Sequence, residues 1–483
     1  MPDSNPQYDA VVIGSGPNGL SAAVRLSQEG LKVIVLEAKP TIGGGTRTQE
    51  LTEPGFLHDV CAAVVPTTAG SPYLNSLGLD KYGLEFIHPE IPYAHPLDHG
   101  GAAIAHRSIE KTADGLGVDG RAYKRLYGEF VDHWDYLSKD VFGTLRLPKH
   151  PLLMARFGWY GRYSAKHLTN SLFKTEKAKA LFAGCAAHSI MPLTNAFSAS
   201  FGLVLGSSAH SVGWPIAKGG TASITNALAE LLKANGGIIQ TDHEVDSLDD
   251  IPSAKTVLFD LTPQQISNIA GDRIPKKYKE KLDAFEYGPG ACKVDWALSE
   301  PVPWTNEECR KAGTLHLGGT FDEVAEGEDV IWKGKHHDKP YVLLSQPSLF
   351  DGTRAPEGKH TLWAYCHVPN DSKEDRTEVI ENQIERFAPG FKDTIISKNT
   401  ITAQGFEQYN SNYIGGDINS GAQYFKQLFG RPVLKWNPYK MPVDGMYICS
   451  SSTPPGGGVH GMCGYHAAQS ALKNEFGISS DKS

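Results

Sequence analysis

The residues best placed to do chemistry lie near the start of the chain, in a glycine-rich turn between two apolar segments. Gly14, Gly16 and Gly19 follow the β-branched segment YDAVVI at 8–13. The small residues at 20–28 predict a helix, and LKVIVL at 31–36 predicts a second strand. Glu37 then stands 18 residues after the third glycine. This order of strand, glycine turn, helix, strand and acid indicates a dinucleotide-binding unit.

Each position in this unit has a physical role. Gly14 permits the tight turn, Gly16 lets backbone approach a pyrophosphate, and Gly19 lets the helix pack closely on the strand. The helix N-terminus offers N–H groups and a partial positive charge to phosphate, and the Glu37 carboxylate can accept hydrogen bonds from ribose hydroxyls. We therefore assign dinucleotide binding to these residues and their neighbours: Gly14, Ser15, Gly16, Pro17, Gly19, Glu37 and Ala38.

A second glycine pattern at 115–120 has similar spacing but a different setting. The polar segment 108–112 precedes it, where a dinucleotide site needs a buried strand. Asp119 in this segment is better explained as a helix cap. The sequence therefore predicts one nucleotide site and no second unit for NAD(P)H.

A further glycine cluster follows Glu37 at 43–45 and leads into Thr46 and Arg47. With it the sequence resembles the two-dinucleotide-binding flavoprotein superfamily of amine oxidases and phytoene desaturases. The resemblance implies FAD as the cofactor. Backbone N–H groups here can face phosphate while Arg47 adds a cation. The residues of this cluster assigned to FAD are Gly44, Gly45, Thr46 and Arg47.

The C-terminal part of the chain carries the other half of the expected cofactor site. A strand is predicted at 445–449, a glycine loop follows, and a helix is predicted at 462–472. In the resembled flavoproteins this helix directs its N-terminus at the flavin pyrimidine edge, where its dipole stabilises negative charge. They also contact adenine through backbone after the strand predicted at 238–245, a position held here by Val245. The resemblance thus adds Val245, Ser451, Gly457, Gly458, Val459, His460 and Met462 to the cofactor site.

Two residues are candidates for catalysis. Lys293 lies in a strand-like apolar run at 287–298, and in the resembled amine oxidases a lysine on this strand holds a water beside flavin N(5). Such a cation could activate oxygen or position a proton-carrying water; the alternative is a lysine that points outward from a half-exposed strand. His460 could act as an acid or base, or could only hydrogen-bond backbone. His58 and Asp59 are interpreted as structural.

Composition limits the remaining possibilities. The 483 residues have a net charge of −8, with 40% hydrophobic and 21% charged residues. These values indicate a globular protein, and they give no basic face for nucleic acid. No apolar run approaches bilayer length, and the polar residues 1–6 give no export signal. The seven cysteines are scattered and odd in number, which favours reduced thiols in the cytoplasm. His336 and His337 have no third ligand nearby, so no metal site is predicted.

The expected fold is a two-domain α/β flavoprotein. We assign 1–75, 215–285 and 435–483 to a discontinuous Rossmann-like FAD-binding domain. The residues 76–214 and 286–434 would form an interleaved substrate domain of mixed sheet and helices. The strings at 412–432 and 445–468 resemble the phytoene-desaturase-related branch typified by pyridine nucleotide-disulfide oxidoreductase domain-containing protein 2.

The resemblance fixes the cofactor better than the substrate. The leading hypothesis is hydride removal from a C–H bond of a small apolar substrate, a polyene or lipid, with electrons passed to oxygen or a quinone. Peripheral contact with a membrane fits such a substrate. Three alternatives stay open: a flavin amine oxidase, a redox-neutral alkene isomerase, and an FAD-binding interaction protein without turnover. Met462 stands where amine oxidases carry a tyrosine, which weakens the first alternative. Nothing in the sequence indicates the oligomeric state.

Overall fold

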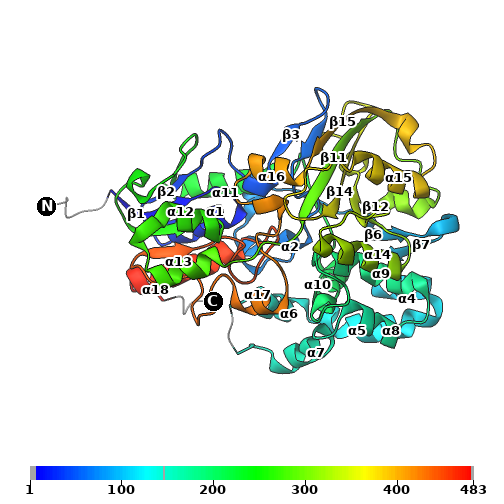
Figure 1. Ribbon diagram of the computed structural model, residues 1–483, viewed down its shortest axis with the longest axis horizontal. Helices are drawn as coiled ribbons and strands as arrows, with labels where there is room; N and C mark the ends of the chain where they lie inside the picture. The colour runs from blue at the N-terminus through cyan, green and yellow to red at the C-terminus, as the bar shows by residue number, and fades with distance from the viewer. Residues whose placement is uncertain (1–6, 145–146, 480–483) are drawn as a thin grey trace.

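Two sheets, one parallel and one mixed, organise the protein (Figure 1). The computed structural model describes residues 7–144 and 147–479. The expectation about export rests on residues 1–6, which lie outside the described residues. The arrangement confirms the predicted fold class of a Rossmann-like domain with a second, mixed-sheet region.

The parallel sheet has five strands in the order β16-β10-β1-β2-β9. β-branched residues dominate β1 and β2, and every residue of β2 is buried, as expected for a sheet covered on both faces. Its strands come from three distant stretches of the chain: β1 (Tyr8–Ile13), β2 (Val33–Leu36), β9 (Ile238–Gln240), β10 (Ala254–Phe259) and β16 (Met446–Ile448). All of them fall inside the segments assigned to the FAD-binding domain, whose boundaries stay a prediction.

Helices cover both faces of the parallel sheet. Three pack on one face: α1 (Pro17–Ser27), α11 (Ala222–Ala234) and α18 (Met462–Glu475). Two pack on the other: α12 (Pro263–Ala270) and α13 (Lys276–Asp283). A Cβ at Gly464 would lie 2.7 Å from the backbone carbonyl carbon of Asn18, so glycine is required where α18 crosses α1. This close approach brings the C-terminal helix beside the first glycine turn.

The mixed sheet has seven strands in the order β15-β11-β14-β13-β12-β6-β7. Only the β6–β12 pair is parallel. Its strands are β6 (Ile91–Pro96), β7 (Ala102–Ala105), β11 (Gly290–Leu298), β12 (Ala312–Leu317), β13 (Val342–Ser345), β14 (His360–Val368) and β15 (Ile395–Ile401). Two short pairs complete the strands: β3 (Thr48–Glu50) with β4 (Leu57–Asp59), and β5 (Phe86–Ile87) with β8 (Ile216–Ala217).

Strand β11 is buried along its whole length, and its two faces carry different kinds of side chain. Val294 and Trp296 point into an apolar core shared with α15 (Thr377–Phe387). Lys293 and Asp295 alternate with them and point to the opposite face. The exposed orientation considered for Lys293 is therefore not observed, because its side chain is only 1% exposed.

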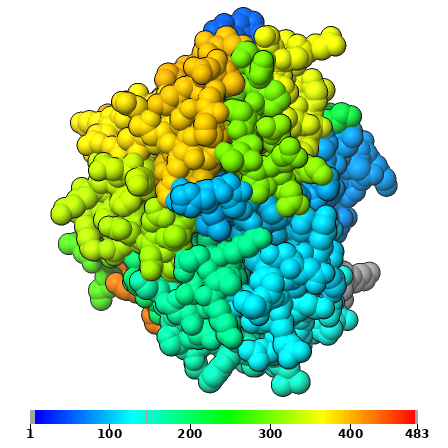
Figure 2. Space-filling model, turned by 90° about the vertical axis from the view of Figure 1, so that its right-hand side faces the viewer, coloured from blue at the N-terminus to red at the C-terminus, as the bar shows by residue number. Residues whose placement is uncertain are grey.

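A helical region covers the inner face of the mixed sheet, and Figure 2 shows it below the elements of that sheet. It comprises α2 (Pro66–Ala69), α3 (Pro72–Ser76), α4 (Ile109–Gly115), α5 (Gly120–Asp132), α6 (Trp134–Val141), α7 (Pro151–Gly161), α8 (Ala165–Leu172), α9 (Glu176–Ala187) and α10 (Ser198–Ser211). The remaining helices are α14 (Phe321–Val330), α16 (Ala403–Tyr409) and α17 (Phe425–Gly430). None of the helices in residues 7–144 and 147–479 combines the length and the apolarity that crossing a bilayer requires.

Three sequence-based expectations differ from the structure in detail. The first helix begins at Pro17, earlier than predicted, because proline suits the first helical position. The strand predicted at 238–245 ends at Gln240, because β9 is an edge strand that pairs only with the four-residue β2. Asp119 does not cap its own helix; its carboxylate accepts the backbone N–H groups of Lys174 and Thr175 at the start of α9.

Candidate functional site

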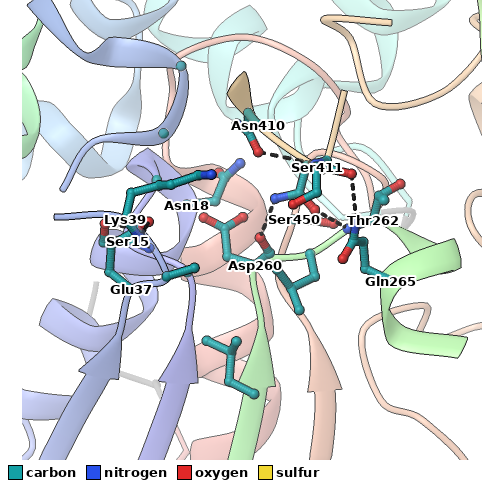
Figure 3. A pocket seen from close by; sticks show the side chains of 18 of the residues that line it. Ser15, Asn18, Glu37, Lys39, Asp260, Thr262, Gln265, Asn410, Ser411 and Ser450 are labelled. Atoms are coloured by element: carbon teal, nitrogen blue, oxygen red, sulfur yellow. Dashed lines mark hydrogen bonds between the residues drawn. The ribbon is translucent and has the colours of Figure 1, made fainter. Parts of the chain in front are cut away.

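A pocket lies at the carboxyl ends of β1, β2 and β10, where a doubly wound sheet binds its ligand. Its empty volume is about 1010 Å³, open space at the mouth included. Figure 3 shows Ser15 and Glu37 on one side, Thr262 and Gln265 on the other, and Asp260 between them. The predicted cofactor residues that line it are Gly14, Ser15, Gly16, Pro17, Glu37, Ala38, Gly44, Gly45, Arg47, Val245 and Ser451.

The first glycine turn has the geometry that its sequence predicts. Gly14 has a φ of +97°, and Pro17 is the first residue of α1. Gly19 donates its backbone N–H to Asp260 Oδ2 at 2.8 Å. A Cβ at Gly16 would lie 2.8 Å from the same oxygen, so a side chain here would displace the Asp260 carboxyl group. The N-terminus of α1 therefore lies next to glycine backbone and to the Asp260 carboxyl group.

Glu37 connects the two glycine clusters. Its Oε2 accepts the Ser15 backbone N–H at 3.1 Å and the Ser15 hydroxyl at 2.5 Å. Its Oε1 accepts the Lys39 backbone N–H at 2.9 Å and Arg47 Nη2 at 3.1 Å. Arg47 also donates to the Thr41 carbonyl and is buried. The Arg47 guanidinium is thus held in position by the Glu37 carboxylate and by the Thr41 carbonyl, without any bound phosphate.

A group of buried charges lies on the inner face of the mixed sheet. Lys293 forms an ion pair with Asp295, and Asp295 Oδ1 lies 3.5 Å from His58 Nδ1. Beside them Asp59 Oδ2 accepts Arg354 Nη2 at 2.6 Å. Burial, followed by the charges of Lys293 and Arg354, lowers the pKa of His58 to about 3. Burial raises the pKa of Asp295 to about 6, although the Lys293 charge opposes this shift.

Lys293 does not line the pocket, but two side chains connect it with the pocket's inner end. Tyr413 lines the pocket next to Gly45, where its hydroxyl leaves no room for a Cβ. The Cys61 thiol lies beside Tyr413 next to Gly45, and Tyr413 and the charge of Lys293 both lower its pKa against the larger effect of burial. Lys293 pairs with Tyr365 across the β11–β14 ladder. The lysine therefore lies just beyond the second glycine cluster, among aromatic side chains.

The loop between β16 and α18 lines the pocket at Ser450 and Ser451, whereas its later residues, from Gly457 to Gly461, do not. His460 accepts the Met462 backbone N–H at Nδ1 (3.0 Å), and its Nε2 lies 3.1 Å from the Gly456 carbonyl. Burial lowers the pKa of His460 to about 4. The predicted cofactor residues that do not line the pocket are Gly19, Thr46, Gly457, Gly458, Val459, His460 and Met462. Their contact with a cofactor stays a prediction.

Comparisons with known proteins agree with this geometry. The family model described as an NAD(P)-binding Rossmann-like domain matches residues 12–77. Pyridine nucleotide-disulfide oxidoreductase domain-containing protein 2 of Rattus norvegicus is 26% identical, over 97% of this chain and 94% of the relative. A neurosporene-forming phytoene desaturase of Rhodobacter capsulatus is 23% identical, over 94% and 92%. The solved structure of putrescine oxidase bound to putrescine has a TM-score of 0.61 at 17% identity, over 96% of this chain and 98% of that one.

Over nearly its whole length the chain is similar to pyridine nucleotide-disulfide oxidoreductase domain-containing protein 2 and to phytoene desaturase, and it shares the fold of putrescine oxidase. It is an FAD-dependent oxidoreductase. The pocket fits this cofactor, because a Cβ at Gly44 would lie 3.2 Å from Gly16 Cα, so that two glycine backbones line one wall. The Asn18 side-chain oxygen is buried there without a hydrogen-bond partner, which is a free acceptor beside the helix N-terminus. When bound, FAD supplies the flavin ring that accepts hydride.

Sequence reasoning missed several residues of the pocket. Asp260 ends β10 as Glu37 ends β2, and an acid directly after a predicted strand was the available signal. Burial, together with the nearby Glu37 charge, raises the pKa of Asp260 to about 7. Asn412 accepts the Thr262 backbone N–H at 2.8 Å and lines the same wall. Its segment was recognised by resemblance, but no pattern in it indicated contact with the first sheet.

Neither metal nor disulfide chemistry is indicated by the side chains. In residues 7–144 and 147–479, no three His, Cys, Asp or Glu side chains are placed to hold a metal ion. All seven cysteines are free thiols, and six of them are buried. The chemistry of the site therefore rests on the cofactor pocket and on the charges around Lys293.

Proposed function

We propose that the protein removes a hydride and a proton from neighbouring carbons of an apolar substrate, a polyene or a lipid. The electrons then pass to oxygen or a quinone, which takes up two protons to give hydrogen peroxide or a quinol. The observation that carries this proposal is the buried Lys293–Asp295 pair next to the inner end of the FAD pocket. The relative from Rhodobacter capsulatus supports the substrate class, since it is named a phytoene desaturase.

The residues around Lys293 suit this chemistry. Hydride transfer needs orientation and a dry site more than it needs an acid and a base. Tyr365 and Tyr413 are buried and supply apolar walls, while Lys293 supplies a cation where negative charge develops on oxygen. Asp295 holds that ammonium group in place. Both ring nitrogens of His460 contact backbone groups of the C-terminal loop. In this proposal Lys293 is therefore the residue that positions the proton-carrying water.

A cytoplasmic location and contact with a membrane surface belong to the same proposal. Seven unpaired thiols, as in this chain, are typical of proteins in a reducing compartment. An enzyme that acts on a lipid-like substrate reaches it most directly from the surface of the bilayer that dissolves it.

Anaerobic flavin spectra test the function. The FAD-loaded protein is mixed with a polyene in detergent micelles and, separately, with a primary amine. Bleaching of the yellow flavin by the polyene alone supports the proposal, and bleaching by the amine alone identifies an amine oxidase. Product formed with an unchanged spectrum identifies an isomerase. Flavin that no candidate reduces, in a protein with a stable partner, would favour the interaction role.

A further inference from the structure

Large apolar side chains that face solvent are concentrated in two segments of the chain. The described residues include eleven such side chains, and eight of them lie between 136 and 159 or between 425 and 436. Leu152 is 86% exposed and Trp436 is 87% exposed, so these are not half-covered core residues. The eight, here termed the apolar face, are Tyr136, Leu147, Leu152, Trp159, Phe425, Phe429, Leu434 and Trp436. Monomeric proteins rarely gather apolar side chains in this way without a binding role.

The two segments are linked at α17 through Phe197. The ring of Phe197 stacks on Phe425 at 5.1 Å and meets the edge of Phe429 at 5.5 Å. The same residue donates its backbone N–H to the carbonyl of Arg162, which directly follows α7. Tyr136 of α6 stacks on His150, the residue before α7, at 4.2 Å. Figure 1 accordingly shows α6, α7 and α17 together along the lower edge of the molecule.

The charge of these segments is opposite to that of the whole protein. Residues 136–159 contain four Lys or Arg and one Asp, and residues 425–436 contain three Lys or Arg, of which Arg431 is buried, and no acid. The complete chain has a net charge of −8. Arg156 and Lys166 pair with acids of neighbouring elements. Within 7–144 and 147–479, Lys149, Arg162 and Lys426 form no ion pair.

We propose that the apolar face docks the protein onto a bilayer that contains anionic phospholipid. Trp, Phe and Leu side chains would enter the boundary between headgroups and acyl chains, while the lysines and arginines meet lipid phosphates. The Arg162 guanidinium lies 3.8 Å from the centre of the Trp159 ring, so cation and apolar surface are presented at one point. A second copy of the chain fits less well, because two such basic surfaces would repel each other. The docking depends on the proposed function in one respect only: it would give the enzyme access to an apolar substrate in the bilayer.

Co-sedimentation with vesicles tests the docking. The FAD-loaded full-length protein is spun with vesicles of phosphatidylcholine alone or with about 30 mol % phosphatidylglycerol, without substrate. We expect pelleting with the anionic vesicles only. We also expect its loss at about 0.5 M NaCl, where charges are screened within a few ångströms.

Two patch variants and one matched control sharpen the test. Leu152→Ser with Trp436→Ser removes apolar contacts, and Arg162→Glu with Lys426→Glu reverses charge. We expect each to lower vesicle binding by about tenfold or more. The control, Val118→Ser with Ile396→Ser, changes side chains that are also exposed but lie outside the apolar face. It should bind as the unchanged protein does, and all variants should retain FAD.

Several results would overturn the docking. One is that the wild-type protein stays in the supernatant when it is mixed with anionic vesicles. Another is that the patch variants and the control variant bind these vesicles equally. A dimer that the Leu152 and Trp436 changes dissociate, without vesicle binding, would assign the face to a second copy instead. Failure here is separable from failure of the proposed function, since flavin reduction by a polyene in detergent does not require a bilayer.

Discussion

Lys293 and Asp295 are two residues apart on β11, and their side chains form an ion pair on a face of the mixed sheet that solvent does not reach. The pair is not isolated, because His58 and the Asp59–Arg354 pair lie beside it. Removing two charges from water is costly, and a buried ion pair repays that cost poorly. A stabilising role alone therefore explains this buried pair poorly, and its place near the FAD pocket fits the role proposed for Lys293.

Lys293→Met should slow the reaction of reduced flavin with oxygen. In the proposed role the ammonium group would place positive charge where oxygen is reduced, and an electrostatic contribution of this kind is worth about 10²–10³-fold in rate. Stopped-flow mixing of photoreduced protein with oxygenated buffer measures this step without any substrate. Reoxidation of the variant at the unchanged rate would remove Lys293 from the reaction with oxygen.

Asp295→Asn should destabilise the fold more than Lys293→Met does. Losing one partner of a buried pair costs about 3–5 kcal/mol, because the other charge is left alone. With Lys293 gone, Asp295 can become neutral by binding a proton, since burial already raises its pKa to about 6. Urea unfolding at neutral pH measures both effects, with the double variant Lys293→Met, Asp295→Leu as reference. A double variant no more stable than Asp295→Asn would contradict an unpaired charge as the cause.

Spacing along the chain predicts the local parts of the fold and site, whereas the joining of distant segments in the parallel sheet was predicted only through the family resemblance. The first glycine turn and Glu37 lie within one strand–helix–strand unit, so spacing alone places them together. Asp295 was missed because a carboxylate in a strand says nothing about which side chain it will face. Asn412 was missed for a similar reason, since it reaches Thr262 across about 150 residues of chain.

Gly16→Ala should abolish FAD binding while leaving most of the fold intact. The added Cβ would lie 2.8 Å from Asp260 Oδ2, directly where α1 begins. Gly128→Ala in α5 is the matched control, because a Cβ there meets nothing within 4 Å and alanine favours the helix by about 1 kcal/mol. FAD content per protein after gel filtration reports the outcome. A yellow, fully loaded Gly16→Ala protein would contradict the assignment of this turn.

His460→Asn should keep FAD and most activity, whereas His460→Ala should lose both. The asparagine oxygen can replace Nδ1 as the acceptor for the Met462 backbone N–H, and alanine cannot. Since burial holds the pKa of His460 at about 4, the ring is neutral at physiological pH. The rate of flavin reduction between pH 6 and 9 should therefore have the same profile in the Asn variant as in the unchanged protein. Loss of one limb of that profile in His460→Asn would instead make His460 an acid or base.

FAD affinity should increase as the pH falls from 8 to 6, through the protonation of Asp260. The folded-state pKa of this carboxyl is about 7, raised from its ordinary value of 3.8 by burial and by Glu37. Above pH 7 the carboxylate repels the pyrophosphate, and below pH 7 the neutral acid does not. The same shift means that the protein without FAD loses stability as the pH rises from about 4 to 7, because the folded state holds this proton longer than the unfolded chain.

Asp260→Asn should remove most of this pH dependence and bind FAD about threefold to tenfold more tightly at pH 8. The amide oxygen can still accept the Gly19 backbone N–H, so the turn keeps its hydrogen bond. Glu244→Gln is the control, because it removes an acid from the exposed rim of the same pocket. Quenching of FAD fluorescence on titration with protein lacking the cofactor gives the affinities. Equal slopes of affinity against pH in Asp260→Asn and the unchanged protein would show that another group carries the proton.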